Sequence, residues 1–201
     1  MLFRSDVFGD RNEEDILKLA LIKKLNTSTN NKLTILFGNH DNAAFNILNN
    51  LSADCLPCVS DFLFLNKLQK KELLNDFKEI IKKNYTLIKK LDNLILSHAP
   101  IRLDVFNCFK TNDDNLHKIC NNINGFFEKL SNFNLKEDQL FNYLIWDRYN
   151  AGNMYLKDEY IDILQICGHD TFIDDKNRLL SLNNMNGKIK NNFEIEYLLC
   201  F

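Results

Sequence analysis

The sequence predicts an α/β fold in which helices and strands pack in layers. Short apolar runs of strand length alternate along the 201 residues with longer stretches in which apolar side chains recur at helical spacing. Hydrophobic residues make up 45% of the chain and include 16 Phe, which excludes a disordered chain because disorder requires low hydrophobicity. No internal repeat and no Gly-, Ser- or Pro-rich linker divides the sequence, so we expect one domain over residues 1–201.

The predicted strands are short apolar runs. They cover Leu2–Phe8, Leu33–Phe37, Asn93–Ser97, Ile163–Cys167, Arg178–Leu182 and Phe193–Phe201. The last three follow one another over short connections, which predicts local antiparallel pairing in the C-terminal part.

The predicted helices occupy the longer stretches between these strands. Glu13–Leu25 and Lys67–Leu91 both carry apolar side chains at helical spacing. The lysines of the second stretch are interleaved with Glu72, Asp76 and Glu79, which indicates a solvated helix face and not a binding surface. Residues 105–142, rich in Asn, Phe and Asp, are interpreted as a helical insertion or cap.

Charge and composition limit the partners. The formal net charge of −2 and the pI of about 6.1 give no general attraction to nucleic acid or to an anionic membrane, and no apolar run is long enough to span a bilayer. The N-terminus lacks the pattern of a secretory signal, so we expect a reducing, cytoplasmic location and free thiols at all six cysteines. Cys55 and Cys58 have the spacing of a redox or zinc pair, but no second pair accompanies them.

Histidines follow three of the predicted strands directly. Gly38-Asn39-His40-Asp41 follows Leu33–Phe37, Ser97-His98-Ala99 includes the end of Asn93–Ser97, and Gly168-His169 follows Ile163–Cys167. The carboxyl ends of strands in an α/β sheet meet at one edge, where ligands bind, so we expect these side chains to converge. A hydrogen-bonded turn residue is the alternative interpretation for any one of these histidines.

The first predicted strand contributes acidic and basic groups to the same set. Its end reads Ser5-Asp6-Val7-Phe8-Gly9-Asp10-Arg11. A carboxylate, an amide oxygen and two imidazoles form a mixed nitrogen and oxygen ligand set, which suits Mn, Fe or Zn better than Ca.

These motifs, in this order, resemble the calcineurin-like metallophosphoesterase superfamily, and within it the phosphoprotein phosphatase group. The segment from Ser5 to Arg11 is similar to the group's Gly-Asp-x-x-Asp-Arg-Gly block, with Ser for the first Gly and one inserted residue. Gly38-Asn39-His40-Asp41, His98 and Gly168-His169 match later blocks. Leu144-Ile145-Trp146-Asp147-Arg148 is similar to the Leu-Leu-Trp-x-Arg segment of bacterial members. The resemblance implies an α-β-β-α sandwich of mixed sheets with helices outside.

The resemblance also implies a role for each matched residue. Asp6, Asn39, His98 and His169 would be metal ligands, with Asp6 bridging two ions. His40 would be the general acid, oriented by Asp10, and Arg11 and Arg148 would bind the phosphate oxygens. The implied activity is hydrolysis of phosphomonoesters, on a phosphorylated protein or a small phosphoester, by attack of a metal-bound hydroxide.

The sequence departs from the group at its N-terminus. The group's Asp-x-His block, which supplies two ligands to the second ion, is expected some 25–30 residues before Asp6, where only five residues stand. We therefore expect an N-terminally truncated domain, and a weak or inactive remnant that binds one metal ion or phosphate is the alternative to an enzyme. Three of these residues or pairs also have a structural interpretation. Asp10 and Arg11 could form a surface pair, and Arg148 could pack on Trp146 or pair with Asp147. Asp41 is interpreted as a hydrogen-bonding residue and not as a catalytic one.

Overall fold

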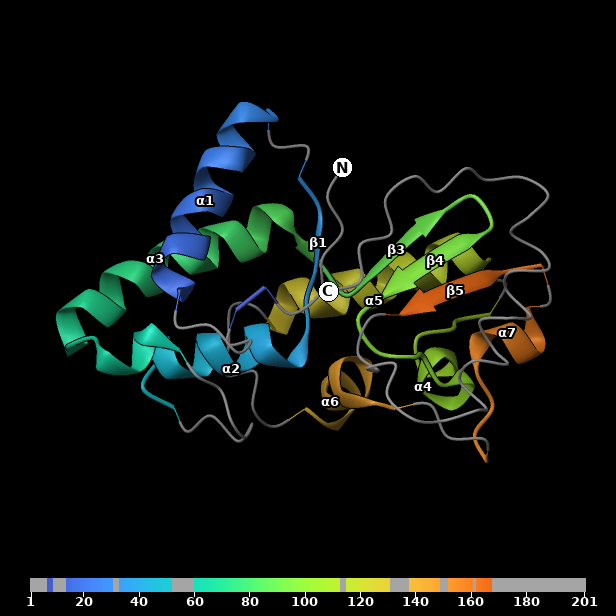
Figure 1. Cartoon of the computed structure of the whole chain (residues 1–201). Coiled ribbons are helices and arrows are strands. Elements are labelled where there is room, and N and C mark those ends of the chain that lie inside the picture. Colours follow the sequence, from blue (N-terminus) through green and yellow to red (C-terminus); the bar gives the residue numbers. More distant parts are fainter. Residues whose placement is uncertain are drawn as a thin grey trace, which may run out of the picture. The chain divides into compact units, whose positions relative to one another are not determined.

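The computed structural model describes residues 7–8, 14–30, 33–51, 60–112, 115–130, 138–148, 152–160 and 162–167 (Figure 1). The chain divides into two units, Met1–His169 and Asp170–Phe201, and every described residue belongs to the first. This first unit is a mixed α/β structure of helices and two small sheets, in agreement with the predicted class.

Helices and strands alternate along the described chain. The first half contains α1 (Asp15–Ser28), β1 (Ile35–Leu36), α2 (Asn39–Leu48), the 3-10 helix η1 (Asp61–Phe64), α3 (Lys67–Asn84) and β2 (Tyr85–Thr86). The second half contains β3 (Ile88–Leu91), β4 (Leu94–Ser97), α4 (Leu103–Asn107), α5 (Leu116–Leu130), α6 (Gln139–Trp146), α7 (Leu156–Glu159) and β5 (Leu164–Cys167).

The strands form one parallel pair and one mixed sheet. β1 and β2 pair in parallel, with α2, η1 and α3 in the connection between them. In the second sheet β4 is central: β3 is antiparallel to it and β5 is parallel to it. Predicted strands 33–37, 93–97 and 163–167 therefore exist as β1, β4 and β5. Residues 2–6 of the first predicted strand and the two strands predicted after residue 177 lie outside the described residues.

The helix predicted over Lys67–Leu91 is wrong in its last third. α3 ends at Asn84, and the chain continues as β2 and β3. The Asn84 side chain donates hydrogen bonds to Asn26 Oδ1 at 2.7 Å and to the Leu33 carbonyl oxygen at 3.0 Å, contacts that fix the end of the helix. Beyond this point the backbone gains strand pairing with β1 and β4, which local spacing of apolar residues cannot reveal.

Side-chain caps fix the start of two other helices. The Asn66 side chain accepts hydrogen bonds from the backbone N–H groups of Leu68 and Gln69 at the start of α3. Asp138 does the same for Leu140 and Phe141 at the start of α6. These caps satisfy backbone donors that have no partner inside the helix.

Phenylalanine dominates the core, as the composition predicts. The Phe side chains with less than 2% exposure are Phe8, Phe37, Phe45, Phe62, Phe77, Phe106, Phe127 and Phe141. Their rings form a chain of contacts: Phe8 packs against Phe77 at 4.7 Å between ring centroids, and Phe37 against Phe127 at 5.0 Å. One core therefore joins the N-terminal segment, the connection between β1 and β2, and the helices that follow β4.

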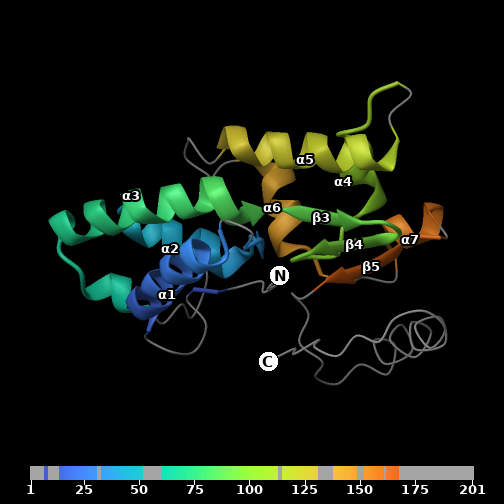
Figure 2. The same cartoon turned by 90° about the horizontal axis from the view of Figure 1, so that it is seen from above.

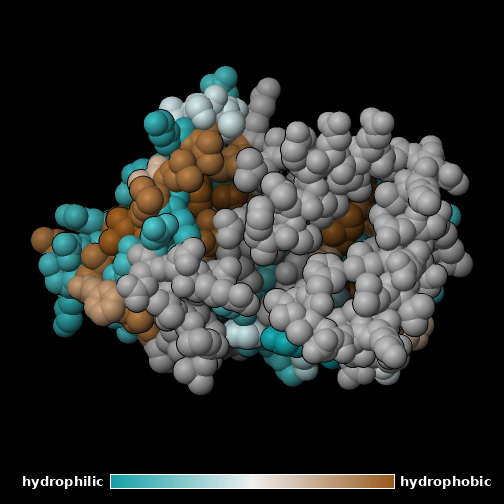
Figure 3. All heavy atoms as spheres, viewed as in Figure 1, coloured by the Kyte–Doolittle hydropathy of each residue, from teal (hydrophilic) through white to brown (hydrophobic). Residues whose placement is uncertain are grey.

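Within residues 105–142 the described segments are largely helical, as predicted. α5 packs against β3 and covers one face of the second sheet (Figure 2). α1 packs on α3 and η1 in the other half. Apolar side chains remain exposed over these three elements (Figure 3): Ile16, Leu17, Leu21, Leu63, Phe64 and Leu68. In the described part of the chain, no helix combines the length and the apolar character needed to cross a bilayer.

Candidate functional site

The candidate site starts where β1 ends and α2 begins. Gly38 is the N-cap of α2, Asn39 is its first residue, and His40 its second. The Asn39 side chain is buried, and His40 is half-buried beside it. The short strand and the tight entry into the helix thus hold two of the predicted site residues at one place.

His98 reaches the same place from the end of β4. Its ring is fully buried, and its Nε2 atom lies 2.8 Å from Oδ1 of Asn39, although the two residues are 59 positions apart in the chain. The structure therefore brings together two of the four predicted metal ligands.

The strand that leads to His169 ends beside the strand that leads to His98. β4 and β5 are parallel, and their register pairs Ser97 with Cys167. A side-chain hydrogen bond also joins the two strands here, because Gln165 Nε2 donates to Ser97 Oγ at 3.1 Å. His169 itself lies outside the described residues, but the last described residue of its strand stands opposite Ser97 at this sheet edge.

Asp41 holds the segment that follows Asp6 against the start of α2. Its Oδ1 atom accepts hydrogen bonds from the backbone N–H groups of Val7 at 3.0 Å and Phe8 at 3.2 Å, and its Oδ2 atom accepts one from Gly38 at 3.0 Å. Asp41 is thus a hydrogen-bonding residue, as one of the sequence interpretations has it. Asp6, Asp10 and Arg11 lie outside the described residues.

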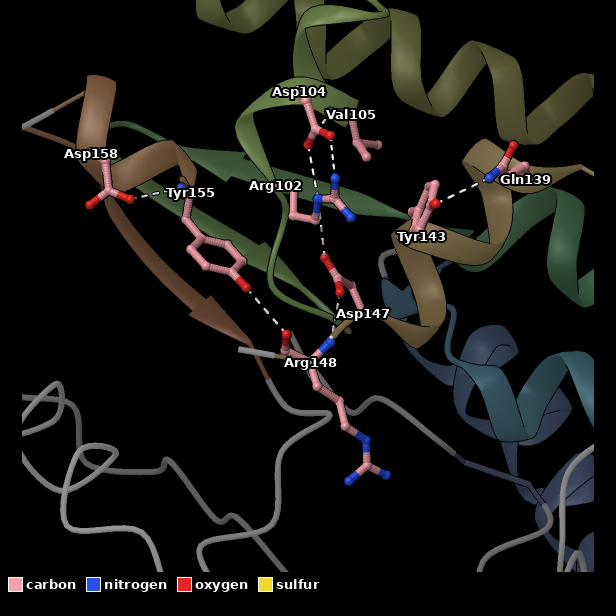
Figure 4. A network of polar contacts seen from close by, with 9 residues as sticks. All are labelled: Arg102, Asp104, Val105, Gln139, Tyr143, Asp147, Arg148, Tyr155 and Asp158. Carbon is pink, nitrogen blue, oxygen red and sulfur yellow. Dashed lines mark hydrogen bonds and ion pairs between the residues drawn. The ribbon is translucent and has the colours of Figure 1, made fainter. Parts of the chain in front are cut away.

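Arg148 lies in a polar network that the sequence did not predict (Figure 4). Its backbone N–H donates to Asp147 Oδ1 at 3.0 Å, and its carbonyl oxygen accepts from the Tyr155 hydroxyl at 3.2 Å. The Arg148 side chain is exposed, and its guanidinium points away from these contacts. Asp147 instead forms an ion pair with Arg102, at 3.9 Å between Oδ2 and Nε. The backbone of Arg148 is therefore fixed on both sides while its charged group faces outward.

Arg102 is the centre of that network. Its guanidinium binds the Asp104 carboxylate through two nitrogens and lies over the Tyr143 ring at 5.0 Å. The hydrogen bond to Asp104 raises the pKa of Arg102, and the same bond lowers the pKa of Asp104. Both groups therefore stay charged across the physiological range. No sequence motif marked Arg102, because its partner Asp147 and the Tyr143 ring are distant in the chain.

The side chains of Asn39 and His98 carry atom types that bind divalent cations in proteins. An amide oxygen and an imidazole nitrogen suit Mn, Fe or Zn. The 2.8 Å between the two atoms is a hydrogen-bond distance, with Nε2 of His98 as donor and Oδ1 of Asn39 as acceptor, and a cation would take this nitrogen without its proton. Within the described residues no group of three or more His, Cys, Asp or Glu is close enough to hold a metal ion. The remaining predicted ligands, Asp6 and His169, stand outside those residues.

Comparison of the chain with protein-family models, with curated proteins and with solved structures finds no match.

Proposed function

We propose that this protein is a metal-dependent phosphoesterase that hydrolyses phosphomonoesters, of the protein-phosphatase kind. The observation that carries the proposal is the buried contact between Asn39 and His98, which follow two different strands and meet at 2.8 Å. Asn39 follows β1 of the two-stranded sheet and His98 follows β4 of the three-stranded sheet, so the two sheets bring one buried amide and one buried imidazole to the same place. The α-β-β-α sandwich belongs to the same proposal.

In this proposal Asn39 and His98 hold one divalent cation together with Asp6 and His169. The bound cation supplies Lewis-acid chemistry, because it neutralises phosphate charge and brings the pKa of water towards neutrality. The burial of Asn39 and His98 favours such a role, since removal of water strengthens the attraction between donor atoms and a cation.

His40 and Arg148 act on the substrate in this proposal. His40 protonates the leaving oxygen, and its place directly after Asn39 on the first turn of α2 sets it beside the proposed ligands. Arg148 presents a planar, permanently charged fork on a fixed backbone, which suits two phosphate oxygens at once. Arg11 and Asp10 complete the predicted set.

The test measures Mn²⁺ binding and the hydrolysis of p-nitrophenyl phosphate on the same preparations. We expect His98→Ala and Asn39→Ala to lose Mn²⁺ binding by calorimetry and to lower kcat/KM by roughly 100-fold or more, since even the partners of metal ligands contribute about 10- to 100-fold. His40→Asn should lower kcat but keep Mn²⁺ binding. Asn75→Ala, on the exposed face of α3, is the matched control and should change neither.

The possible outcomes distinguish an enzyme from a non-catalytic remnant of the same fold. Mn²⁺ binding that depends on His98, without turnover, identifies a non-catalytic remnant. Wild-type protein that binds no divalent cation contradicts both. Equal kcat for wild type and His40→Asn removes His40 from the proton-transfer step.

A further inference from the structure

A polar cavity lies between α5 and the strands β2 and β3, and it shares no residue with the candidate site. Its volume is about 250 Å³. It reaches Thr34 and Asn84 next to the starting ends of β1 and β2, whereas Asn39 follows the opposite end of β1. α5 packs against β3 over the same sheet (Figure 2).

The charged side chains around this cavity are all basic. Lys83, Lys89 and Lys90 line it together with the imidazole of His117, and neither Asp nor Glu is among its lining residues. Glu79 pairs with Lys83 at 3.4 Å, but both side chains are exposed on α3, and exposed pairs of this kind are weak. Burial raises the pKa of the Cys120 thiol, another lining group, to about 11, so it adds no negative charge at neutral pH. The cavity therefore has excess positive charge that an anion would neutralise.

Uncharged polar side chains also line the cavity. Asn84 is 3% exposed, and its amide nitrogen donates to Asn26 and to the Leu33 carbonyl oxygen. Within the described part of the chain its Oδ1 atom has no hydrogen-bond partner. This oxygen is closed off from solvent, so a ligand in the cavity does not reach it. Thr34 and Asn121 add further hydrogen-bonding groups to the lining.

Size limits the ligand. At about 250 Å³ the cavity is smaller than a drug-sized site of about 300–1,000 Å³. A ligand of this size with one anionic end and several hydroxyl donors matches the lining. We propose that this cavity binds a small sugar phosphate, with its phosphate near the lysines and His117 and its hydroxyls on the amide and threonine groups.

The test is binding of ribose 5-phosphate to the whole chain by calorimetry in the presence of EDTA, so that no metal ion mediates binding at the candidate site. We expect one site per chain, no binding of ribose, and weaker binding of inorganic phosphate. Lys89→Ala and His117→Ala should each weaken binding about tenfold, because the first removes an ammonium donor and the second an imidazole N–H donor. Lys82→Ala, an exposed lysine of α3 outside the cavity, is the matched control and should bind as wild type does.

Two further variants make the site assignment falsifiable. Asn121→Trp places a large ring at the exposed rim and should abolish binding without a change of charge. Arg148→Ala changes only the proposed phosphoesterase site and should leave binding intact, so failure here and failure of the proposed function can be told apart. Absence of binding to wild type at millimolar ligand, loss of binding in Arg148→Ala alone, or equal affinity for inorganic phosphate would each overturn the proposal.

Discussion

Removal of the Asp41 carboxylate should destabilise the protein more than any surface charge change, because this carboxylate joins two distant segments. Asp41 is fully buried and accepts three backbone hydrogen bonds, from Val7, Phe8 and Gly38. Val7 and Phe8 stand more than 30 positions away in the chain, and Phe8 is a core residue that packs on Phe77. The Asp41→Ala variant leaves all three N–H groups without this acceptor.

The magnitude follows from these three bonds. A hydrogen bond to a charged group contributes about 1.5–3 kcal/mol, and the contributions of neighbouring bonds do not add fully. We therefore expect Asp41→Ala to lower the free energy of unfolding by about 3–5 kcal/mol. Asp41→Asn keeps the shape and one acceptor oxygen but turns an amide NH2 group towards a backbone donor, so a loss of about 2–3 kcal/mol is expected.

Urea unfolding followed by circular dichroism measures both values. Asp76→Ala is the control, because Asp76 forms an exposed ion pair with Lys23 at 2.7 Å, and such pairs contribute about 0–1 kcal/mol. The midpoints should rank wild type and Asp76→Ala highest, then Asp41→Asn, then Asp41→Ala. A loss of less than about 1 kcal/mol in Asp41→Ala would refute the claim that this carboxylate holds the N-terminal segment in place.

Two more predictions concern α5. The Asn124 side chain accepts hydrogen bonds from Thr86 Oγ1 and from the N–H groups of Leu87 and Ile88, and donates one to the Ile88 carbonyl oxygen. We therefore expect Asn124→Ala to lower the free energy of unfolding in urea by about 2–4 kcal/mol. The control Asn121→Ala, on the same helix, should lower it by under about 0.5 kcal/mol, and equal losses would contradict this role for Asn124. Burial raises the pKa of the Cys120 thiol from 9.0 to about 11, so the folded state favours the neutral thiol. The stability that this group contributes is therefore present below pH 9 and is lost as the pH rises towards 11. The total loss in the free energy of unfolding is about 2–3 kcal/mol. Cys120→Ala should show a shallower loss of stability over that pH window, and identical slopes for the two proteins would argue against the shift.

Much of the fold could be predicted from the sequence where a signal is local. The runs at β1, β4 and β5 are short and apolar, and α1 and most of α3 show helical spacing, so their type follows from pattern alone. The end of α3 did not follow, because Ile88 and Leu91 also continue its helical spacing. A local signal for a turn was present in the two residues after Leu91. Asp92, the first of them, adopts a positive φ of 46°, which is common for Asp in tight turns. The deciding contacts, between Asn84 and residues Asn26 and Leu33, are not local.

Part of the candidate site could likewise be predicted from the sequence, and part of it could not. That Asn39 and His98 lie together was predicted from their place after strands, and the structure brings them into contact. The network around Arg102 was not predicted, because a single Arg before a short helix has no distinctive spacing and two of its partners, Tyr143 and Asp147, come from α6 and its end. Likewise Asn124 resembles any other polar residue of an Asn-rich segment until the backbone of residues 86–88 is placed beside it.

The reason that strand-end residues are predictable is geometric. Once β4 and β5 pair in parallel with Ser97 opposite Cys167, the residues after both strands start from neighbouring backbones about 4.8 Å apart, whatever their side chains are. Pairing of this kind needs only apolar runs, which are visible in the sequence, whereas a side-chain partner such as Asp147 for Arg102 requires the complete packing of several helices. The neighbourhood of residues that follow paired strands can therefore be inferred before the fold is known, whereas side-chain partners from packed helices cannot, because their positions depend on contacts that only the folded chain defines.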